Sequence, residues 1–304
     1  MNKSVKTALI ASGLYVGSVF GSKLLVSQTP KAIKPFFRNR SPYVFAHRGG
    51  LILAPEHTMA AFNIASQYDI DGFEIDIRLT KDEQIVVLHD ANVDRVSNGS
   101  GLVSDHTLAE LETLDFGYYF KDINGEYTYR GHNDAKIVTL ESLLKAFPNL
   151  KINIDIKDHP STKAGQLVPS LLYRLIQDLN AFDQVLVTSF HDEQIVRFNQ
   201  YANGRVAIGS GEQEVRNAFL LFNSGFGHLF QPKGDTFQIP TNVKGIRLDS
   251  EKFIHFMQSL NLAVGYWVVN QIDEMDQLLQ KGAHTIVTDR PDIAHHLIQE
   301  KYKK

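Results

Sequence analysis

Eight short apolar runs alternate with helix-like segments along this chain, and this alternation limits the folds open to it. The runs occupy 43–46, 73–77, 151–157, 184–190, 205–209, 245–249, 263–269 and 284–289, and the helix-like segments occupy 58–68, 165–180, 192–201, 213–223, 250–260, 272–280 and 293–302. Strands that alternate with helices favour an α/β fold with a parallel sheet. Eight such strands favour a closed TIM (β/α)8 barrel. An open doubly wound sheet is the alternative, but the chain lacks the glycine-rich dinucleotide loop that would support it.

The length and composition fit one large enzyme-sized domain. The chain has 304 residues, of which 43% are hydrophobic and 21% are charged, so it can build an ample core. Its net charge of -3 gives no sign of a nucleic-acid partner. The chain contains no cysteine, which excludes disulfides, thiolate metal sites and a cysteine nucleophile.

The regular alternation is interrupted after the second apolar run. Residues 84–90 form a further strand-like run, and residues 91–138 are rich in Gly, Asn, Asp and Tyr with one helical piece at 107–114. We therefore expect an insertion at about 80–138, after strand two, that lies over the mouth of the barrel. Long connections of this kind are usually functional or mobile.

A second irregular stretch, 224–243, places large apolar side chains among glycines and prolines. These side chains are Phe226, Leu229, Phe230 and Phe237. One interpretation is a loop packed on the core. The other is an apolar lip that meets lipid, because exposed apolar patches usually mark interaction surfaces.

Residues 1–40 differ from the barrel domain that we expect at 41–304. Lys3 and Lys6 precede an apolar run that reaches Val26 with one further lysine, close to the roughly 20 residues that cross a bilayer. An uncleaved membrane anchor, a cleaved export signal and a soluble helix all remain open. Basic residues after the run could also rest on anionic lipid head groups. We expect membrane association through this segment, with export after signal cleavage as the alternative.

Charged side chains gather at the carboxyl ends of the first three predicted strands. His47 ends the first, Glu74 and Asp76 end the second, and Asp155 and Lys157 end the third. Catalytic groups of barrel enzymes lie at these ends. Side chains two apart on a strand share a face, so Glu74 and Asp76 converge and require a neighbouring cation. Hard oxygen ligands suit Mg²⁺ or Ca²⁺, and the set fits metal-assisted phosphoryl chemistry.

Other candidate residues also follow apolar runs, namely Arg48, His89, Ser189, Trp267 and Asp289. Each of the main candidates also has a purely structural interpretation. The two acids could be exposed on an edge strand, Asp155 and Lys157 could form a structural ion pair, and the histidines could be structural. Trp267 could pack in the core or stack on a substrate. We assign no role to the remaining loop-like histidines, among them His57, His106, His132, His295 and His296.

Several motifs in order carry a resemblance to a known family. They are HRG at 47–49, PEHT at 55–58, EID at 74–76, TKDEQIVVLHD at 80–90, NIDIK at 153–157, TSF at 188–190, WVVN at 267–270 and GAHTIVTDRPD at 282–292. In these motifs the chain resembles the glycerophosphodiester phosphodiesterases. The resemblance covers nearly all of 43–293, and it implies a TIM barrel that hydrolyses a phosphodiester to an alcohol and a phosphomonoester.

The resemblance also implies roles for individual residues. His47 and His89 would be the acid and base, and Arg48 and Lys157 would contact the phosphate. One divalent cation, Mg²⁺ or Ca²⁺, would be bound by the three acidic residues Glu74, Asp76 and Asp155. Glu56 would lie near the metal and substrate, Trp267 would contact the substrate, and Ser189 is a further possible site residue.

Two positions depart from the family pattern. His57 stands where the family has Asn, and Asp155 stands where Glu is more frequent. Asp-x-Lys at 155–157 and the apolar N-terminus are similar to the membrane-anchored, lysophospholipase D-type branch. The family resemblance as a whole implies metal-dependent hydrolysis of glycerophosphodiesters to an alcohol and glycerol 3-phosphate, and this is the expected activity. The alternative is cleavage of lysophospholipids to lysophosphatidic acid, and a third is an inactive barrel that binds membranes.

Overall fold

Eight parallel strands form the centre of the molecule in a computed structural model that describes residues 3–302. The strands are β1 (Tyr43–His47), β2 (Gly72–Leu79), β4 (Lys151–Ile156), β5 (Val185–Thr188), β6 (Ala207–Ile208), β7 (Thr236–Ile239), β10 (Ala263–Tyr266) and β11 (Thr285–Thr288). They pair in the order β6-β5-β4-β2-β1-β11-β10-β7. A parallel bridge between Gly209 and Thr236 joins the two ends of this order, which confirms the predicted TIM barrel.

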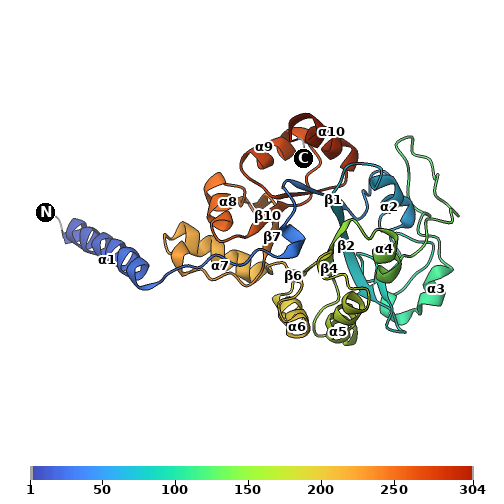
Figure 1. Ribbon diagram of the computed structural model, residues 1–304, viewed down its shortest axis with the longest axis horizontal. Coiled ribbons are helices and arrows are strands. Elements are labelled where there is room, and N and C mark those ends of the chain that lie inside the picture. Colours follow the sequence, from blue (N-terminus) through green and yellow to red (C-terminus); the bar gives the residue numbers. More distant parts are fainter. Residues whose placement is uncertain (1–2, 303–304) are drawn as a thin grey trace.

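Helices surround the strands in the way that the alternating sequence predicted (Figure 1). They are α2 (Met59–Ala65), α4 (Leu140–Ala146), α5 (Lys163–Asp178), α6 (Asp192–Ala202), α7 (Glu212–Asn223), α8 (Glu251–Gln258), α9 (Ile272–Gln280) and α10 (Pro291–Lys301). Their apolar faces pack on the outward-facing aliphatic residues of the strands in one large core. Short polar caps begin several of them: the side chain of Thr162, for example, accepts a hydrogen bond from the backbone of Gly165.

One predicted strand is wrong. Residues 245–249 do not enter the barrel, because Ile246 and Arg247 form β9 (Ile246–Arg247), which pairs antiparallel with β8 (Asn242–Val243) in a small exposed hairpin. The barrel position belongs instead to β7, whose sequence TFQI lies inside the stretch expected to be irregular. Glycine and proline around it hide a four-residue strand from pattern reading, whereas its pairing with β10 is unambiguous in space.

The segment after β2 carries its own small core. β3 (Ile85–Val87) pairs antiparallel with β2, and η2 (Val103–Asp105) and α3 (Leu108–Glu112) follow. Val86, Leu88, Val93, Leu111 and Phe116 pack together beneath these elements. The insertion is therefore a folded unit attached to the barrel through β3.

Aromatic side chains close the amino-terminal end of the barrel. Phe36, from η1 (Pro35–Phe37), packs with Tyr43, Phe45, Leu186 and Val287. The ring centroids of Phe36 and Phe45 lie 6.1 Å apart. The segment that carries Phe36 runs along this end, where the backbone of Lys31 donates to the carbonyl of Leu260. This end of the barrel is therefore a packed core rather than an opening.

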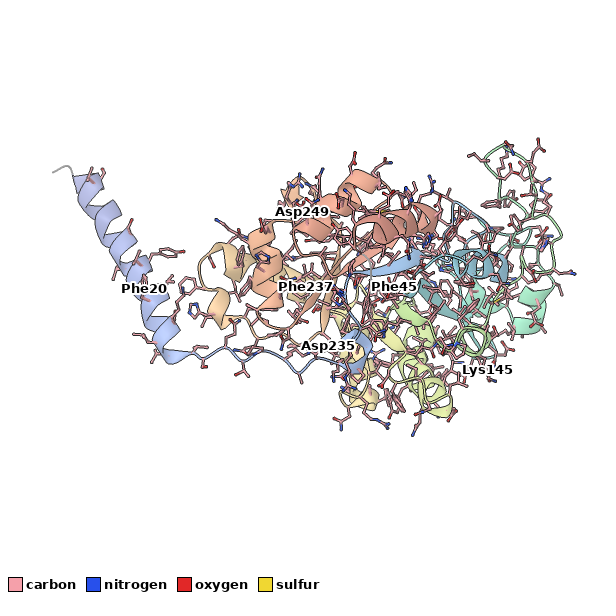
Figure 2. All side chains as sticks on the ribbon, turned by 45° about the horizontal axis from the view of Figure 1, so that its top comes forward. Phe20, Phe45, Lys145, Asp235, Phe237 and Asp249 are labelled. Atoms are coloured by element: carbon pink, nitrogen blue, oxygen red, sulfur yellow. The ribbon has the colours of Figure 1, made fainter. Side chains whose placement is uncertain are left out.

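Helix α1 (Lys3–Leu25) extends away from the barrel (Figures 1 and 2). It contacts the barrel near η3 (Gly227–Leu229), where Ser22 Oγ lies 2.9 Å from His228 Nε2 and the ring of Tyr15 lies edge-on to Phe226. In the part of the chain that the structure describes, neither α1 nor any other helix combines the length and the apolar character needed to cross a bilayer.

Phe36 should be a main contributor to stability. We expect Phe36→Ala to lower the free energy of unfolding by about 3–5 kcal/mol, because the removed ring leaves a cavity in a packed core. The matched change Phe20→Ala, on α1 where the side chain is 65% exposed, should change it by less than about 0.5 kcal/mol. Urea denaturation measures both, and equal effects of the two changes would contradict this account of the closed end.

Candidate active site

A cavity of about 490 Å³ opens at the carboxyl ends of the barrel strands. One part of its wall is charged and includes His47, Arg48, Glu74, Asp76, His89, Asp155 and Lys157. The strands explain this convergence: in the register of the sheet His47 lies beside Glu74, and Asp76 lies beside Asp155. The structure therefore brings together the main residues that the sequence singled out.

Each of the two candidate catalytic histidines has an aspartate at Nδ1. His47 Nδ1 lies 2.5 Å from Asp289 Oδ1, and His89 Nδ1 lies 2.7 Å from Asp90 Oδ1. Asn270 holds Asp289 in turn, donating to its Oδ2 at 2.7 Å. A carboxylate at Nδ1 keeps a proton on that nitrogen and leaves Nε2 free for chemistry in the cavity.

The environment of His47 favours its protonated form. Burial lowers the pKa of an imidazole, but the hydrogen bond to Asp289 and the nearby Glu74 carboxyl outweigh burial and raise the pKa of His47. Its Nε2 lies 3.8 Å from Glu74 Oε2. A histidine whose protonated form is favoured in this way is suited to donating a proton.

Three carboxyl groups lie close together below the histidines. Asp76 and Asp155 are buried, and Glu74 is 14% exposed. Burial and the neighbouring Asp76 raise the pKa of Glu74 to about 8. Burial also raises the pKa of Asp155, whereas the positive charges of Lys157 and Arg48 outweigh burial at Asp76 and lower its pKa. The three acids therefore cannot all ionise without more positive charge.

Lys157 supplies part of that charge. Its Nζ lies 2.6 Å from Asp155 Oδ2 and 2.9 Å from Asp76 Oδ1. The ion pair considered from the sequence is thus present, but it is shared with Asp76. Despite burial, the two carboxylates raise the pKa of Lys157, so it remains a cation.

The acids retain oxygen atoms that could bind a metal ion. Among the described residues, Glu74 Oε2, Asp76 Oδ2 and Asp155 Oδ1 are buried without a hydrogen-bond partner. Unpaired buried carboxylate oxygens fit a hard divalent cation. Residues 3–302 contain no group of three His, Cys, Asp or Glu side chains that already has the geometry of a metal site. We attribute this to Lys157, whose ammonium group holds the other oxygens of Asp76 and Asp155.

Arg48 lies in the same wall of the cavity and is held by Glu56. Arg48 Nη1 donates to Glu56 Oε1 at 3.0 Å, and Arg48 Nε lies 3.4 Å from Asp76 Oδ2. Burial opposes ionisation of Glu56, but hydrogen bonds from Arg95 and the charge of Arg48 lower its pKa to about 2. Glu56 is therefore an anion that orients Arg48 toward the cavity.

His57 corrects an expectation from the sequence, which placed it in a loop without a role. It is 2% exposed and lies in the left-handed region with φ 59°. Its Nε2 accepts a hydrogen bond from the backbone of Asp76 at 3.3 Å, and burial lowers its pKa to about 3. His57 is thus a neutral histidine that braces the strand carrying the acids.

The two less certain candidates also line the cavity. Ser189 is buried, and its hydroxyl donates to the carbonyl of Ile156 at 2.9 Å, so its bond holds β4 in place. The indole of Trp267 donates to the carbonyl of Gln238 at 2.8 Å and lies edge-on to Phe190, with ring centroids 5.7 Å apart. Trp267 therefore presents a fixed aromatic surface to the cavity.

The stretch 224–243 divides between the two ends of the barrel. Gln238, Ile239, Pro240 and Val243 line the cavity. The earlier part, with η3, lies near the start of β7 and contacts the segment after α1, where Gln28 donates to the carbonyl of Phe230 at 2.8 Å. Phe230 and Phe237 are buried in the core, as the first of the two interpretations has it, so the four apolar side chains do not form one exposed lip.

Sequence reasoning missed three polar residues of the site: Arg95, Asn153 and Asn270. Arg95 joins Glu56 to Asp90. Asn153 lies beside Glu74 in the sheet and lines the cavity. Two of them stood within quoted motifs, NIDIK for Asn153 and WVVN for Asn270, so their place in the motifs was the available signal.

Comparisons with known proteins agree with the fold and the site. The glycerophosphoryl diester phosphodiesterase family matches residues 47–293. The chain is 30% identical over 263 residues to a glycerophosphodiester phosphodiesterase of Caldanaerobacter subterraneus, covering 84% of this chain and 98% of that protein. It is 29% identical over 255 residues to one of Bacillus subtilis, covering 82% and 84%.

Solved structures of low sequence identity share the fold. A glycerophosphoryl diester phosphodiesterase domain from Mycobacterium tuberculosis superposes with a TM-score of 0.73 at 19% identity, covering 84% of this chain and 99% of that one. An Oleispira antarctica phosphodiesterase in complex with the product sn-glycerol-3-phosphate has a TM-score of 0.65 at 20% identity, covering 85% and 97%. The chain belongs to the glycerophosphoryl diester phosphodiesterase family of phosphoric diester hydrolases.

Proposed function

We propose that this enzyme hydrolyses small glycerophosphodiesters to an alcohol and glycerol 3-phosphate with the help of one divalent cation. The observation that carries the proposal is the pair of histidine–aspartate couples that face the same cavity as three buried acids. The Oleispira antarctica phosphodiesterase, which is similar in fold, was solved with glycerol 3-phosphate as its product. That product matches the proposed one.

The two histidines divide the proton transfers. His89 takes the proton of the attacking hydroxyl as an oxygen–phosphorus bond forms. When this hydroxyl belongs to water, glycerol 3-phosphate forms directly. When it belongs to the glycerol part of the substrate, a cyclic phosphate forms, and water opens it in a second step to give glycerol 3-phosphate. His47, whose pKa is raised by Asp289 and Glu74, acts as the acid: in its protonated form it gives a proton to the leaving oxygen as the phosphorus–oxygen bond to the alcohol breaks. General acid and base catalysis of this kind contributes about 10²- to 10⁴-fold in rate.

The positive side chains hold the phosphate. Arg48 lies between Glu56 and Asp76 at the cavity wall, and Lys157 lies above Asp76 and Asp155. Both can neutralise charge that develops on the phosphoryl oxygens. Glu74, Asp76 and Asp155 would hold the cation, Mg²⁺ or Ca²⁺, which when bound polarises a phosphoryl oxygen as a Lewis acid.

Lysophospholipid cleavage to lysophosphatidic acid is a second candidate, favoured by one observation. The part of the cavity wall away from the acids is apolar and includes Val215, Ile239, Pro240, Val243 and Leu248. Such a wall suits an acyl chain. A catalytically inactive barrel gains no support, because acid, base and ligand positions are all filled.

We further propose that α1 rests on an anionic lipid surface. It contains no acidic residue and three lysines, and Phe20, Leu24 and Leu25 are at least 65% exposed. Lysines attract anionic head groups, and exposed apolar side chains often mark a surface that meets a partner. Because α1 joins the amino-terminal end of the barrel, the cavity would open away from that surface, which favours water-soluble diesters over lysophospholipids in the same membrane.

Vesicle binding is the direct test of α1. We expect the full chain to sediment with phosphatidylglycerol vesicles, and we expect replacement of Phe20, Leu24 and Leu25 by Ser to abolish sedimentation without lowering activity. Phosphatidylcholine vesicles are the control for charge. Protein that stays in the supernatant with both kinds of vesicle would contradict the proposed attachment.

Product analysis tests the activity. Wild type should release choline and glycerol 3-phosphate from glycerophosphocholine, and a chelator should stop the release. His47→Ala and His89→Ala should each lower kcat by about 10²- to 10⁴-fold, whereas His296→Ala, on the exposed face of α10, should not. Release of choline from lysophosphatidylcholine alone would favour the second candidate, and release of phosphocholine would contradict both.

Cation binding should depend on pH through Glu74. Its pKa of about 8 means that the folded, cation-free protein holds a proton that the unfolded chain loses near pH 4.5, so stability without the cation should fall as the pH rises between these values. A cation binds the ionised form, so its affinity should rise toward pH 8 and each binding event should release protons. Titration calorimetry in two buffers of different ionisation enthalpy measures the release, and binding without proton release at pH 7 would contradict it.

A further inference from the structure

Arg95 lies in the insertion and contacts two carboxylates, one of which holds His89 and the other Arg48. It lies eight residues after the end of β3 and its side chain is 47% exposed. Its guanidinium donates to two carboxylates, those of Glu56 and Asp90. We propose that Arg95 is a positioning residue that orients His89 through Asp90 and Arg48 through Glu56. The inference rests on the proposed phosphodiesterase function.

The first branch runs to His89. Arg95 Nε donates to Asp90 Oδ2 at 2.6 Å, and Arg95 Nη2 donates to Asp90 Oδ1 at 3.3 Å. The same Oδ1 receives His89 Nδ1 at 2.7 Å. A two-point contact with the guanidinium stops the Asp90 carboxylate from rotating, and this fixes the direction of His89 Nε2.

The second branch runs to Arg48. Arg95 Nη1 and Nη2 donate to Glu56 Oε2 and Oε1 at 2.9 and 2.8 Å. Glu56 Oε1 also receives Arg48 Nη1 at 3.0 Å. Glu56 therefore lies between two guanidinium groups, and without Arg95 it would be free to follow Arg48 away from the cavity.

The geometry requires an arginine. The planar guanidinium presents donors on two edges, and each edge of Arg95 meets a different carboxylate. A lysine ammonium is a point charge that cannot make two such forked contacts at once. Single exposed ion pairs contribute little to stability, so a half-exposed arginine with four such bonds is better explained by orientation of its partners.

Arg290 is a matched control at the same end of the barrel. It forks onto one carboxylate, with Nε and Nη2 donating to Asp292 at 2.9 and 2.7 Å. Its side chain is 34% exposed, and Asp292 lies only two residues away in the chain. Loss of Arg290 removes a similar ion pair without disturbing either histidine.

Kinetics of the full chain test the inference. With glycerophosphocholine as substrate, Arg95→Met should lower kcat by about 10- to 100-fold, because small misplacements of catalytic groups have effects of this size, and Arg95→Lys should recover little of it. Arg290→Met should leave kcat within about twofold. Combined with Asp90→Asn, Arg95→Met should have a smaller effect than it has alone. Additive effects, or wild-type kcat in Arg95→Met, would overturn the inference.

A second readout does not depend on turnover. Because a carboxylate holds the Nδ1 proton of His89 and of His47, each should give a downfield imidazole proton signal, assigned with His89→Ala and His47→Ala. Arg95→Met and Arg95→Lys should shift or broaden the His89 signal and spare the His47 signal, and Arg290→Met should spare both. An unchanged His89 signal would overturn the inference even in a protein without activity, whereas an inactive wild type with the expected signals would contradict only the proposed function.

Discussion

Crowding of negative charge at the ends of β2 and β4 is the constraint on which the site depends. Glu74, Asp76 and Asp155 face one point because β2 and β4 are neighbours in register, and burial makes their common ionisation costly. Neighbouring cations neutralise part of this negative charge: Lys157 bridges two of the acids, and Arg48 lies beside Asp76. A divalent ion would neutralise the remaining negative charge of the three acids. The site is therefore suited to binding a cation and, next to it, a phosphate group.

The two ends of the barrel are separated in chemistry. Aromatic packing around Phe36 and Tyr43 closes the amino-terminal end. The segment after α1 is held there by an ion pair between Lys31 and Asp235, whose charged atoms lie 2.8 Å apart. The carboxyl end is polar and open. Because of this separation, the N-terminal segment can change its surroundings without disturbing the cavity. The insertion, in contrast, reaches the residues of the cavity through the contacts of Arg95 with Asp90 and Glu56.

Period-two alternation predicted that Glu74 and Asp76 share a face, and alternation of strands and helices predicted the barrel, because both depend on local pattern. The aspartate partner of His47 could not be predicted in the same way, since Asp289 lies 242 residues away and meets His47 only when β11 pairs with β1. His57 was misplaced because a left-handed turn folds it back onto Asp76. Residues 245–249 were predicted as a barrel strand because their composition resembles one, and only the pairing of Ile246 and Arg247 with 242–243 shows that they belong to a hairpin.

Anomalous diffraction from crystals soaked in Mn²⁺ tests the central claim most directly, because it locates a hard divalent ion without reference to activity. The account predicts one strong peak within bonding distance of carboxylate oxygens of Glu74, Asp76 and Asp155, with the Lys157 ammonium moved off the position between Asp76 and Asp155. A soaked crystal with no peak at these acids, and with Lys157 still bridging Asp76 and Asp155, would show that the Lys157 ammonium is the cation of the site. The proposed metal chemistry would then be wrong.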